Sequence, residues 1–284
     1  MMLSAQSILD FPVPQATHVV TARDAILYAL SVGYGTDGPD DNKTLKYVYE
    51  RDLVTAPTLA NIVAHPGPWM KDAGVDWARL VHSEHRLTIH RPVPLDVPLI
   101  SRSRVLSVVD RGVEKGVFVS FERLIATADS DEPIATIVQT NACRGDGGCG
   151  SAGSAPEPLP KVPDREPDLE FNIDIPDNAA LLYRLNGDLN PLHVDPQAAG
   201  RSGFDRPILH GLCSFGYAGY AIVAAIDPSM ASGLSAIAAR FSAPIFPGET
   251  ITVQMWRNDA EIRFRGLVAS RGATILDNGI ARLS

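Results

Sequence analysis

The sequence predicts an α+β protein built from two similar halves, each a helix followed by several antiparallel strands that wrap around it. A stretch rich in Gly, Pro and Ser at residues 144–168 divides the chain of 284 residues into halves of about 140 and 120 residues, enough for two small cores. The same order of helix and strand patterns recurs in both halves. One long apolar segment in the second half is typical of a buried helix.

The elements follow the same order in the two halves. Each half begins with a helical apolar pattern that contains Leu-Tyr-x-Leu, in residues 22–42 and 177–196, and continues into a polar loop. Two strands separated by a proline-containing turn follow, in residues 85–109 and 238–257. Each half ends with runs that alternate apolar and polar side chains, as antiparallel strands do. These runs occupy residues 116–129, 132–142, 260–270 and 272–283.

One apolar segment, residues 208–226, has no charged side chain after His210 and is rich in Ala and Gly. Its length favours a helix that is buried on nearly all sides, and its small residues would let a sheet pack closely against it. Residues 56–74 form a weaker counterpart in the first half. We therefore expect an N-terminal repeat in residues 1–150, a linker in residues 151–167 and a C-terminal repeat in residues 168–284.

Composition and charge exclude several classes of protein. The formal net charge is −8 and the pI is near 5.3, which argues against nucleic acid as a partner. No run of apolar residues is long enough for a membrane span, and the N-terminus does not resemble a secretory signal. Three cysteines fit a reducing compartment. The final residues, ARLS, differ from the Ser-Lys-Leu type of peroxisomal signal. We expect a cytoplasmic protein, or a peroxisomal one in a eukaryote, with no membrane partner.

The stretch LYRLNGDLNPLHVDP, residues 182–196, concentrates polar side chains between leucines. Taken singly, Asp188 and Asn190 are ordinary turn formers beside a proline, and His193 is an ordinary loop residue. The first half, however, follows its Leu-Tyr motif with YGTDGPDDN and has no histidine at the matching place. This asymmetry indicates one active half. A carboxylate and an imidazole at the spacing of Asp188 and His193 can hold a water molecule and remove its proton.

His210 and Gly211 stand at the start of the apolar helix. A backbone N–H at a buried helix N-terminus can stabilise negative charge that develops on an oxygen. The residues between 183 and 211 thus offer a base, a second proton carrier and an oxyanion donor. A metal site formed by His193, Asp195 and His210 is a weaker alternative.

Other chemistry-bearing motifs fit known sites less well. Cys143 and Cys149 lack the second ligand pair that a zinc site needs. The RGDGGCG loop lacks the lysine and the Ser or Thr of a phosphate-binding loop, and reads equally well as the start of a flexible linker. Cys213 reads as a small core residue. We therefore expect no metal.

YRLNGDLNPLHVDP, followed by GFDRPILHGLCSFG, resembles the signature of the MaoC-like hydratases. More narrowly, it resembles the (R)-specific 2-enoyl-CoA hydratases, called hydratase 2, which include the hydratase part of peroxisomal multifunctional enzyme type 2. LVHSEHRLTIHRPVP and the RGDGG loop are similar to the N-terminal repeat of that family. ARFSAPIFPGETITVQMW is similar to its C-terminal repeat. The resemblance covers most of residues 20–283.

The resemblance implies a double hot-dog fold and reversible syn hydration of trans-2-enoyl-CoA to (3R)-3-hydroxyacyl-CoA. It implies no cofactor, since coenzyme A is part of the substrate. Asp188 and His193 match the catalytic dyad, Asn190 matches the residue that helps to place the water, and Gly211 matches the oxyanion donor. Further positions match the supporting polar shell and the acyl-CoA site: Tyr183, Arg184, Asp195, His210, His82, Ser83, Arg111 and Phe241.

The sequence departs from the family pattern outside the dyad. Ser83 replaces the usual glycine, Arg111 replaces a lysine, residues 147–151 read GGCGS instead of GGFGG, and Leu189 stands where some members have tryptophan. These departures affect expectations about coenzyme A contacts and chain length.

The first half, without a polar cluster, would hold a medium-length, long or bulky acyl tail. The alternatives are a hydratase of short branched or dicarboxylic acyl-CoA, a non-catalytic acyl-CoA-binding protein and, more weakly, a thioesterase. A homodimer is expected by analogy only.

Overall fold

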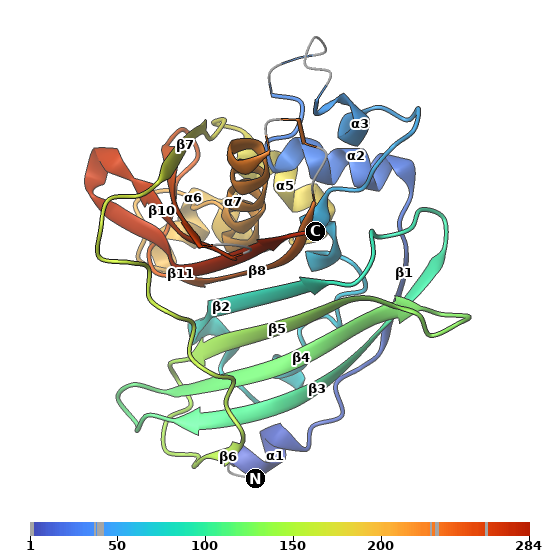
Figure 1. Ribbon diagram of the computed structural model, residues 1–284. Helices are drawn as coiled ribbons and strands as arrows, with labels where there is room; N and C mark the ends of the chain where they lie inside the picture. The colour runs from blue at the N-terminus through green and yellow to red at the C-terminus, as the bar shows by residue number, and fades with distance from the viewer. Residues whose placement is uncertain (1–2, 37, 39–42, 228, 231–232, 259–260) are drawn as a thin grey trace. The chain divides into compact units, whose positions relative to one another are not determined.

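The computed structural model describes residues 3–36, 38, 43–227, 229–230, 233–258 and 261–284. The described chain forms two compact units (Figure 1). The first unit contains Met1–Val19, Val63–Arg91 and Val97–Pro158, and the second contains Val20–Ile62, Pro92–Asp96 and Leu159–Ser284. The second unit therefore combines the C-terminal half of the chain with a helical segment from the N-terminal half.

The first unit is built on an antiparallel sheet with the strand order β1-β3-β4-β5-β2, and β6 pairs with β3. Short helices pack against it, and their apolar side chains join those of β3 and β4 in one core. Ile8, Trp69 and Phe121 are buried members of that core. The elements are α1 (Ala5–Leu9), β1 (Ala16–Val19), α4 (Trp69–Asp72), η2 (Trp77–Arg79), β2 (Leu80–Ile89), β3 (Pro98–Asp110), β4 (Val117–Thr127), β5 (Pro133–Cys143) and β6 (Ala152–Gly153).

The second unit has its own antiparallel sheet, with the strand order β8-β11-β10-β9-β7. The long helix α7 packs against this sheet (Figure 1). The strands are β7 (Leu169–Asp174), β8 (Leu234–Phe241), β9 (Thr250–Asn258), β10 (Glu261–Val268) and β11 (Ala273–Leu283). The helices are α2 (Ala22–Ser31), α3 (Leu45–Val48), η1 (Pro57–Asn61), α5 (Ala179–Tyr183), η3 (Arg184–Asn186), η4 (Pro191–His193), α6 (Pro196–Arg201), α7 (Gly211–Ile226) and η5 (Ala269–Arg271).

Helix α7 confirms the helix that its length and composition predict. Every residue from Cys213 to Val223 is buried. Its glycines allow close approach on the α2 side: a Cβ at Gly216 would lie 2.5 Å from Cγ1 of Val32, and one at Gly219 would lie 3.0 Å from Cγ2 of Thr58. The small residues of α7 thus let residues of the N-terminal half, Val32 and Thr58, pack closely against this helix, in addition to the sheet.

The weaker helical pattern in the first half does not form one long helix. Residues 57–61 form only the 3₁₀ turn η1, and residues 69–72 form the single turn α4. Proline lacks the N–H that a helix interior needs, and Pro66 and Pro68 interrupt the segment between the two turns. The strands predicted in both halves are confirmed.

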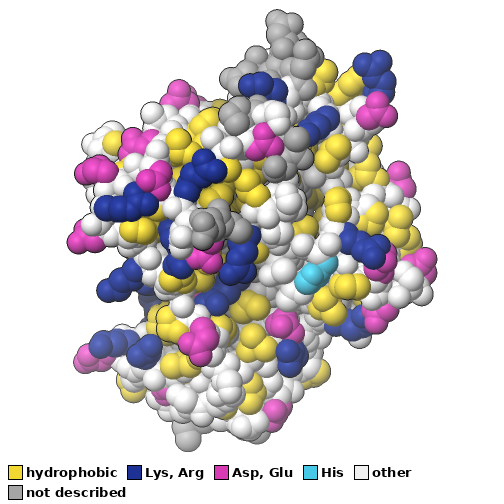
Figure 2. Space-filling model, in the orientation of Figure 1, with side chains coloured by type: hydrophobic (Ala, Val, Ile, Leu, Met, Phe, Trp, Pro, Cys, Tyr) yellow, Lys and Arg dark blue, Asp and Glu magenta, His cyan; other side chains and the backbone are white. Residues whose placement is uncertain are grey.

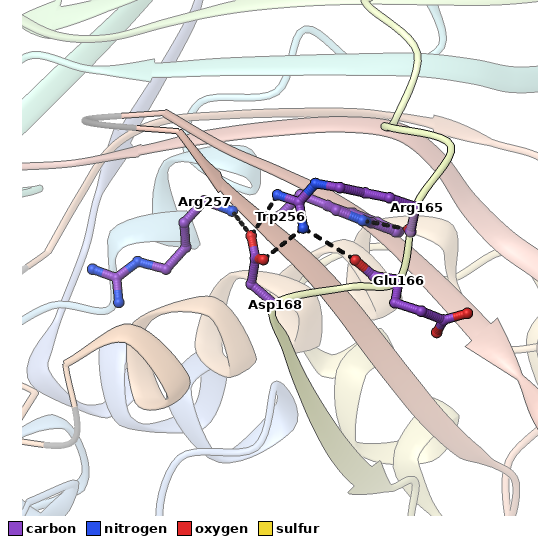
Figure 3. Close-up of polar contacts among 5 residues, drawn as sticks. All are labelled: Arg165, Glu166, Asp168, Trp256 and Arg257. Carbon is purple, nitrogen blue, oxygen red and sulfur yellow. Dashed lines mark hydrogen bonds and ion pairs between the residues drawn. The ribbon is translucent and has the colours of Figure 1, made fainter.

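The end of the segment between the repeats is fastened to β9 by polar contacts (Figure 3). Arg165 and Asp168 form a two-pronged ion pair, with Nη1–Oδ1 and Nη2–Oδ2 distances of 2.6 and 2.8 Å. The indole N–H of Trp256 donates to the carbonyl of Arg165, and the backbone N–H of Arg257 donates to Asp168. The hydrogen bond from Arg165 contributes most to lowering the pKa of Asp168 to about 2. These contacts set where β7 begins.

The surface carries charges of both signs. Figure 2 shows basic and acidic side chains interspersed over the face in view. Among the described helices, none is both long enough and apolar enough to cross a bilayer.

Candidate active site

The polar cluster lies on the irregular segment between α5 and α6 in the second unit. Gly187, with a φ of +111°, ends η3 in the left-handed region and turns the chain into the loop. The carboxylate of Asp188 then accepts from the N–H of Asn190 at 3.2 Å. The side-chain oxygen of Asn190 accepts from the N–H of Leu192 at 3.0 Å and caps η4. Asn190 therefore fixes the bend that brings His193 back towards Asp188.

His193 is buried, and a hydrogen bond to the backbone orients its ring. The Nδ1 atom lies 2.8 Å from the carbonyl oxygen of Ile208. A carbonyl oxygen only accepts, so we assign the proton to Nδ1 and the lone pair to Nε2. Burial lowers the pKa of His193, and the Ile208 carbonyl and the Asp188 charge partly oppose that effect. The ring is thus neutral at neutral pH, with Nε2 available as a base.

His210, the residue before α7, lies directly on His193. The two rings stack with centroids 3.7 Å apart and planes at 27°. The Nε2 atom of His210 donates to the backbone carbonyl of Asp188 at 3.2 Å, and the ring of Tyr183 lies 4.9 Å away. Burial, followed by the neighbouring His193, lowers the pKa of His210 to about 4. His210 therefore joins the helix start to both members of the predicted dyad.

Gly211 begins α7, and the ring of Phe241 covers it. A Cβ at Gly211 would lie 3.2 Å from Cε1 of Phe241. The first N–H groups of a helix have no acceptor within the helix. The N–H of Gly211 is thus placed at a partly buried helix start beside the stacked imidazoles, where it can serve as an oxyanion donor.

Asp188, His193 and His210 each offer one potential metal-ligand atom, and these atoms lie within 4.8 Å of one another. The lone pair of an imidazole nitrogen lies in the plane of its ring. Because the two rings stack nearly parallel, their lone pairs run side by side and do not converge on one point. The carboxylate of Asp195 accepts from the N–H of Gln197 at 2.8 Å and caps α6. The arrangement suits proton transfer better than metal binding.

The remaining predicted residues belong to the first unit. His82 and Ser83 lie on β2, and the ring of His82 meets that of His85 edge to face at 5.1 Å. Arg111 follows β3 and lines a surface hollow of about 650 Å³ together with Glu114, Lys115, Phe118 and Arg144. Three of these side chains are cationic and one is anionic, so the lining carries a net positive charge.

The RGDGGCG loop, residues 144–150, contributes Arg144 to this hollow and is held in place by hydrogen bonds to Asp110. The N–H groups of Gly148 and Gly150 both donate to the carboxylate of Asp110, and so does that of Gly112. These bonds, with that of Gly148 the largest, lower the pKa of Asp110. The loop N–H groups that a phosphate would need are thus bound to a carboxylate of the chain, and the loop holds Arg144 beside the Arg111 turn.

Two family models together match most of the chain. The MaoC like domain matches residues 158–277, and the MFE-2 hydratase 2 N-terminal domain matches residues 18–145. The chain is 37% identical over 266 residues to 3-hydroxyacyl-thioester dehydratase Y of Mycobacterium tuberculosis, covering 91% of each. It is 31% identical to the probable enoyl-CoA hydratase 2 of Dictyostelium discoideum, covering 99% of this chain and 97% of that one. The chain belongs to the MaoC-like hydratase 2 family.

Solved structures agree with this assignment. A MaoC-like dehydratase from Phytophthora capsici superposes with a TM-score of 0.86 at 30% identity, covering 98% of each chain. A double hot-dog protein of Mycobacterium tuberculosis has a TM-score of 0.59 at 15% identity, covering 96% of this chain and 94% of that one, and supports the fold alone. This member of the hydratase 2 family therefore has a double hot-dog fold.

Sequence reasoning missed several residues that support this hydratase 2 site. The side-chain amide of Asn186 donates to Oγ of Ser31 at 3.0 Å and to the carbonyl of Tyr183 at 2.9 Å. The thiol of Cys213 donates to the carbonyl of Ser31 at 3.3 Å. These bonds tie α2 to α7 and to the catalytic segment, residues 183–196. The repeated Leu-Tyr-x-Leu pattern was the available signal, because it marks α2 and α5, which pack together.

Proposed function

We propose medium- or long-chain trans-2-enoyl-CoA thioesters as the substrates of this hydro-lyase. The enzyme adds water across the C2=C3 double bond to give (3R)-3-hydroxyacyl-CoA, and it catalyses the reverse dehydration. The observation that carries the site assignment is the neutral His193, whose Nε2 lone pair is left free by the Ile208 bond beside the Asp188 carboxylate.

In the proposed mechanism, Asp188 and His193 hold one water molecule at C3. The dyad takes a proton from the water as its oxygen bonds to C3, and the π electrons move to the thioester oxygen as an enolate. When the enolate collapses, the dyad returns a proton to C2 from the same face. One water molecule is added in total, with syn stereochemistry and without a metal or a redox cofactor. Proton transfer of this kind contributes ~10²–10⁴-fold to the rate.

The enolate oxygen needs a hydrogen-bond donor in a site that excludes water. The N–H of Gly211 supplies it, at the start of a 16-residue helix whose dipole favours negative charge at this end. Losing one oxyanion donor typically costs about 10²–10³-fold in kcat. Phe241 covers Gly211 and would keep bulk water away from this oxygen.

The basic hollow of the first unit supports a role for Arg111 in binding the phosphates of coenzyme A. Arg111, Lys115 and Arg144 supply three cations against the single carboxylate of Glu114. Guanidinium groups bind phosphate with paired, charge-assisted hydrogen bonds. His82 and Ser83 on β2 remain the proposed contacts for the rest of the carrier. In the wild type, KM should be higher for 3′-dephospho-CoA thioesters than for CoA thioesters, and Arg144→Ala should abolish this difference. Equal KM values for the two thioesters in the wild type would contradict the placement.

The N-terminal segment supports an acyl tail of medium or greater length. Where the second half has a 16-residue helix, the first half has the five-residue turn η1 and the four-residue turn α4. We propose that this shorter helical content leaves room for a substrate tail in the first half. A substrate series from four to sixteen carbons tests this proposal, which predicts kcat/KM rising with length. A preference for four carbons would contradict it.

Two further assignments belong to the proposal. Leu181, Leu185 and Leu189 are each more than half exposed around the catalytic segment, and exposed apolar groups of this kind favour a partner. We assign a homodimer, which light scattering would detect and Leu185→Glu would weaken.

All three cysteines are free thiols, which fits the cytoplasm, or the peroxisome of a eukaryote. A fluorescent fusion would test the compartment.

The test of the reaction is the loss of enoyl absorbance when purified protein meets trans-2-decenoyl-CoA. The product is then offered to a dehydrogenase specific for the (3S) isomer. Hydration that leaves a product inert to that dehydrogenase supports the proposal. Release of a free thiol would indicate a thioesterase, and binding without turnover would indicate an acyl-CoA-binding protein.

A further inference from the structure

Three buried polar atoms belong to residues next to the catalytic dyad and have no hydrogen-bond partner among the described residues. They are the hydroxyl oxygen of Tyr183, Nε of Arg184 and Nδ1 of His210. Tyr183 and His210 are 2% and 1% exposed, and their rings are in contact at 4.9 Å. The charge of Arg184 acts on the His210 ring and contributes to lowering its pKa. A buried polar group left without a partner is destabilising, and Tyr183 and Arg184, consecutive in the chain, both act on the His210 ring.

The hydrogen-bonding roles of the three atoms are complementary to one molecule. His210 donates through Nε2 to the Asp188 carbonyl, so its Nδ1 carries a lone pair and accepts. Burial raises the pKa of Tyr183 well above its usual range, so the hydroxyl keeps its proton and donates. The Nε–H of Arg184 only donates. A water molecule can accept two hydrogen bonds while donating one, and buried waters typically make about three.

We propose that an ordered water occupies this position, accepting from Tyr183 and Arg184 and donating to Nδ1 of His210. This inference rests on the proposed function for its catalytic meaning. The water is distinct from the reacting one, because it lies on the Nδ1 side of His210 and is held by residues of α5 and η3. Tyr183 is then a positioning residue, acting through His210.

The bridge fixes the tautomer of His210 and, through it, the catalytic loop. A donor at Nδ1 keeps the His210 proton on Nε2, where it holds the carbonyl of Asp188. Without that donor, the Nδ1–H tautomer competes and the Asp188 carbonyl loses its partner. The Asp188 carbonyl would then be held less firmly, and the His193 ring that stacks on His210 would be positioned less firmly.

The experiment compares Tyr183→Phe with the wild type in a protein carrying ¹⁵N-labelled histidine. Ring nitrogens with and without a proton are well separated in ¹⁵N NMR spectra, so the tautomer of His210 is read directly, with His210→Asn assigning the signal. The wild type should show His210 protonated at Nε2, and Tyr183→Phe should show a mixture. The kcat for enoyl-CoA hydration should fall about 5–30-fold, as expected for about 1–2 kcal/mol, with KM within about twofold.

Tyr28→Phe is the matched control. Tyr28 is also fully buried, and its ring lies 6.2 Å from that of Tyr183, but its hydroxyl donates to the carbonyl of Thr58 at 2.9 Å. Its removal should lower stability and leave the His210 tautomer unchanged. An unchanged tautomer in Tyr183→Phe, or the same mixture in Tyr28→Phe, would overturn the inference. The spectrum is read without substrate, so a failed hydratase assignment would leave this test intact.

Discussion

Gly211 offers a prediction whose size follows from one distance. The Cβ of Gly211→Ala would lie 3.2 Å from Cε1 and 3.4 Å from Cδ1 of Phe241. Such contacts require a shift of a few tenths of an ångström. Overpacking costs about 1–3 kcal/mol, and alanine regains up to about 1 kcal/mol over glycine within a helix. The free energy of unfolding should therefore fall by only about 0–2 kcal/mol.

The catalytic effect of Gly211→Ala should exceed its effect on stability. Complete loss of an oxyanion donor costs about 10²–10³-fold, and a misplacement of about 1 Å costs about 10²-fold. A shift of a few tenths of an ångström should thus lower kcat by about 3–10-fold.

Steady-state hydration of trans-2-decenoyl-CoA measures this loss, and a double-mutant cycle with Phe241→Leu tests its cause. In the Phe241→Leu background, which lacks the ring, Gly211→Ala should lower kcat by a smaller factor. An identical cost in both backgrounds would refute the reasoning, as would a wild-type kcat in Gly211→Ala.

Three other predictions concern stability. Gly216→Ala should cost about 1–3 kcal/mol in urea unfolding, because its Cβ would lie 2.5 Å from Cγ1 of Val32; no loss would contradict the α2–α7 packing. Asn186→Ala should cost about 1–2 kcal/mol because its amide makes two hydrogen bonds, whereas Asn172→Ala, with an exposed contact, should cost less. Burial lowers the pKa of His193, and that of His210 to about 4, from the ordinary 6.5. The unfolded chain then binds more protons, so the free energy of unfolding should fall as pH drops from about 6.5 towards 4. His210→Asn should flatten that fall, and an unchanged slope would count against it.

Local sequence patterns predicted the parts of the fold that depend on local physics. Alternating strands, the apolar run of α7 and the turn residues around Pro191 each carry their structure within a few neighbouring positions. The first half departed from its helical pattern because Pro66 and Pro68 interrupt it. Likewise, the packing of α2 in the second unit depends on the fit of Val32 against Gly216, which no local pattern encodes.

The candidate site shows the same division. The spacing of Asp188, Asn190 and His193 indicated a shared locus, and Asn190 forms the bend as a cap. The stack of His193 on His210 and the carbonyl of Ile208 that sets the tautomer join residues 15 or more positions apart. Such partners depend on how the loop meets the start of α7. Arg144 was missed because it is distant from Arg111 in the sequence and only the fold brings the two side chains to one hollow.

The central claim is that Asp188 and His193 act together on one water molecule. The most direct test is kcat for hydration of trans-2-decenoyl-CoA by Asp188→Asn and His193→Gln, each near-isosteric, with folding checked by circular dichroism. Each variant should lose about 10²–10⁴-fold in kcat with little change in KM, and the double variant should lose little more than either single one. A kcat above about a tenth of the wild-type value in either variant would contradict the account.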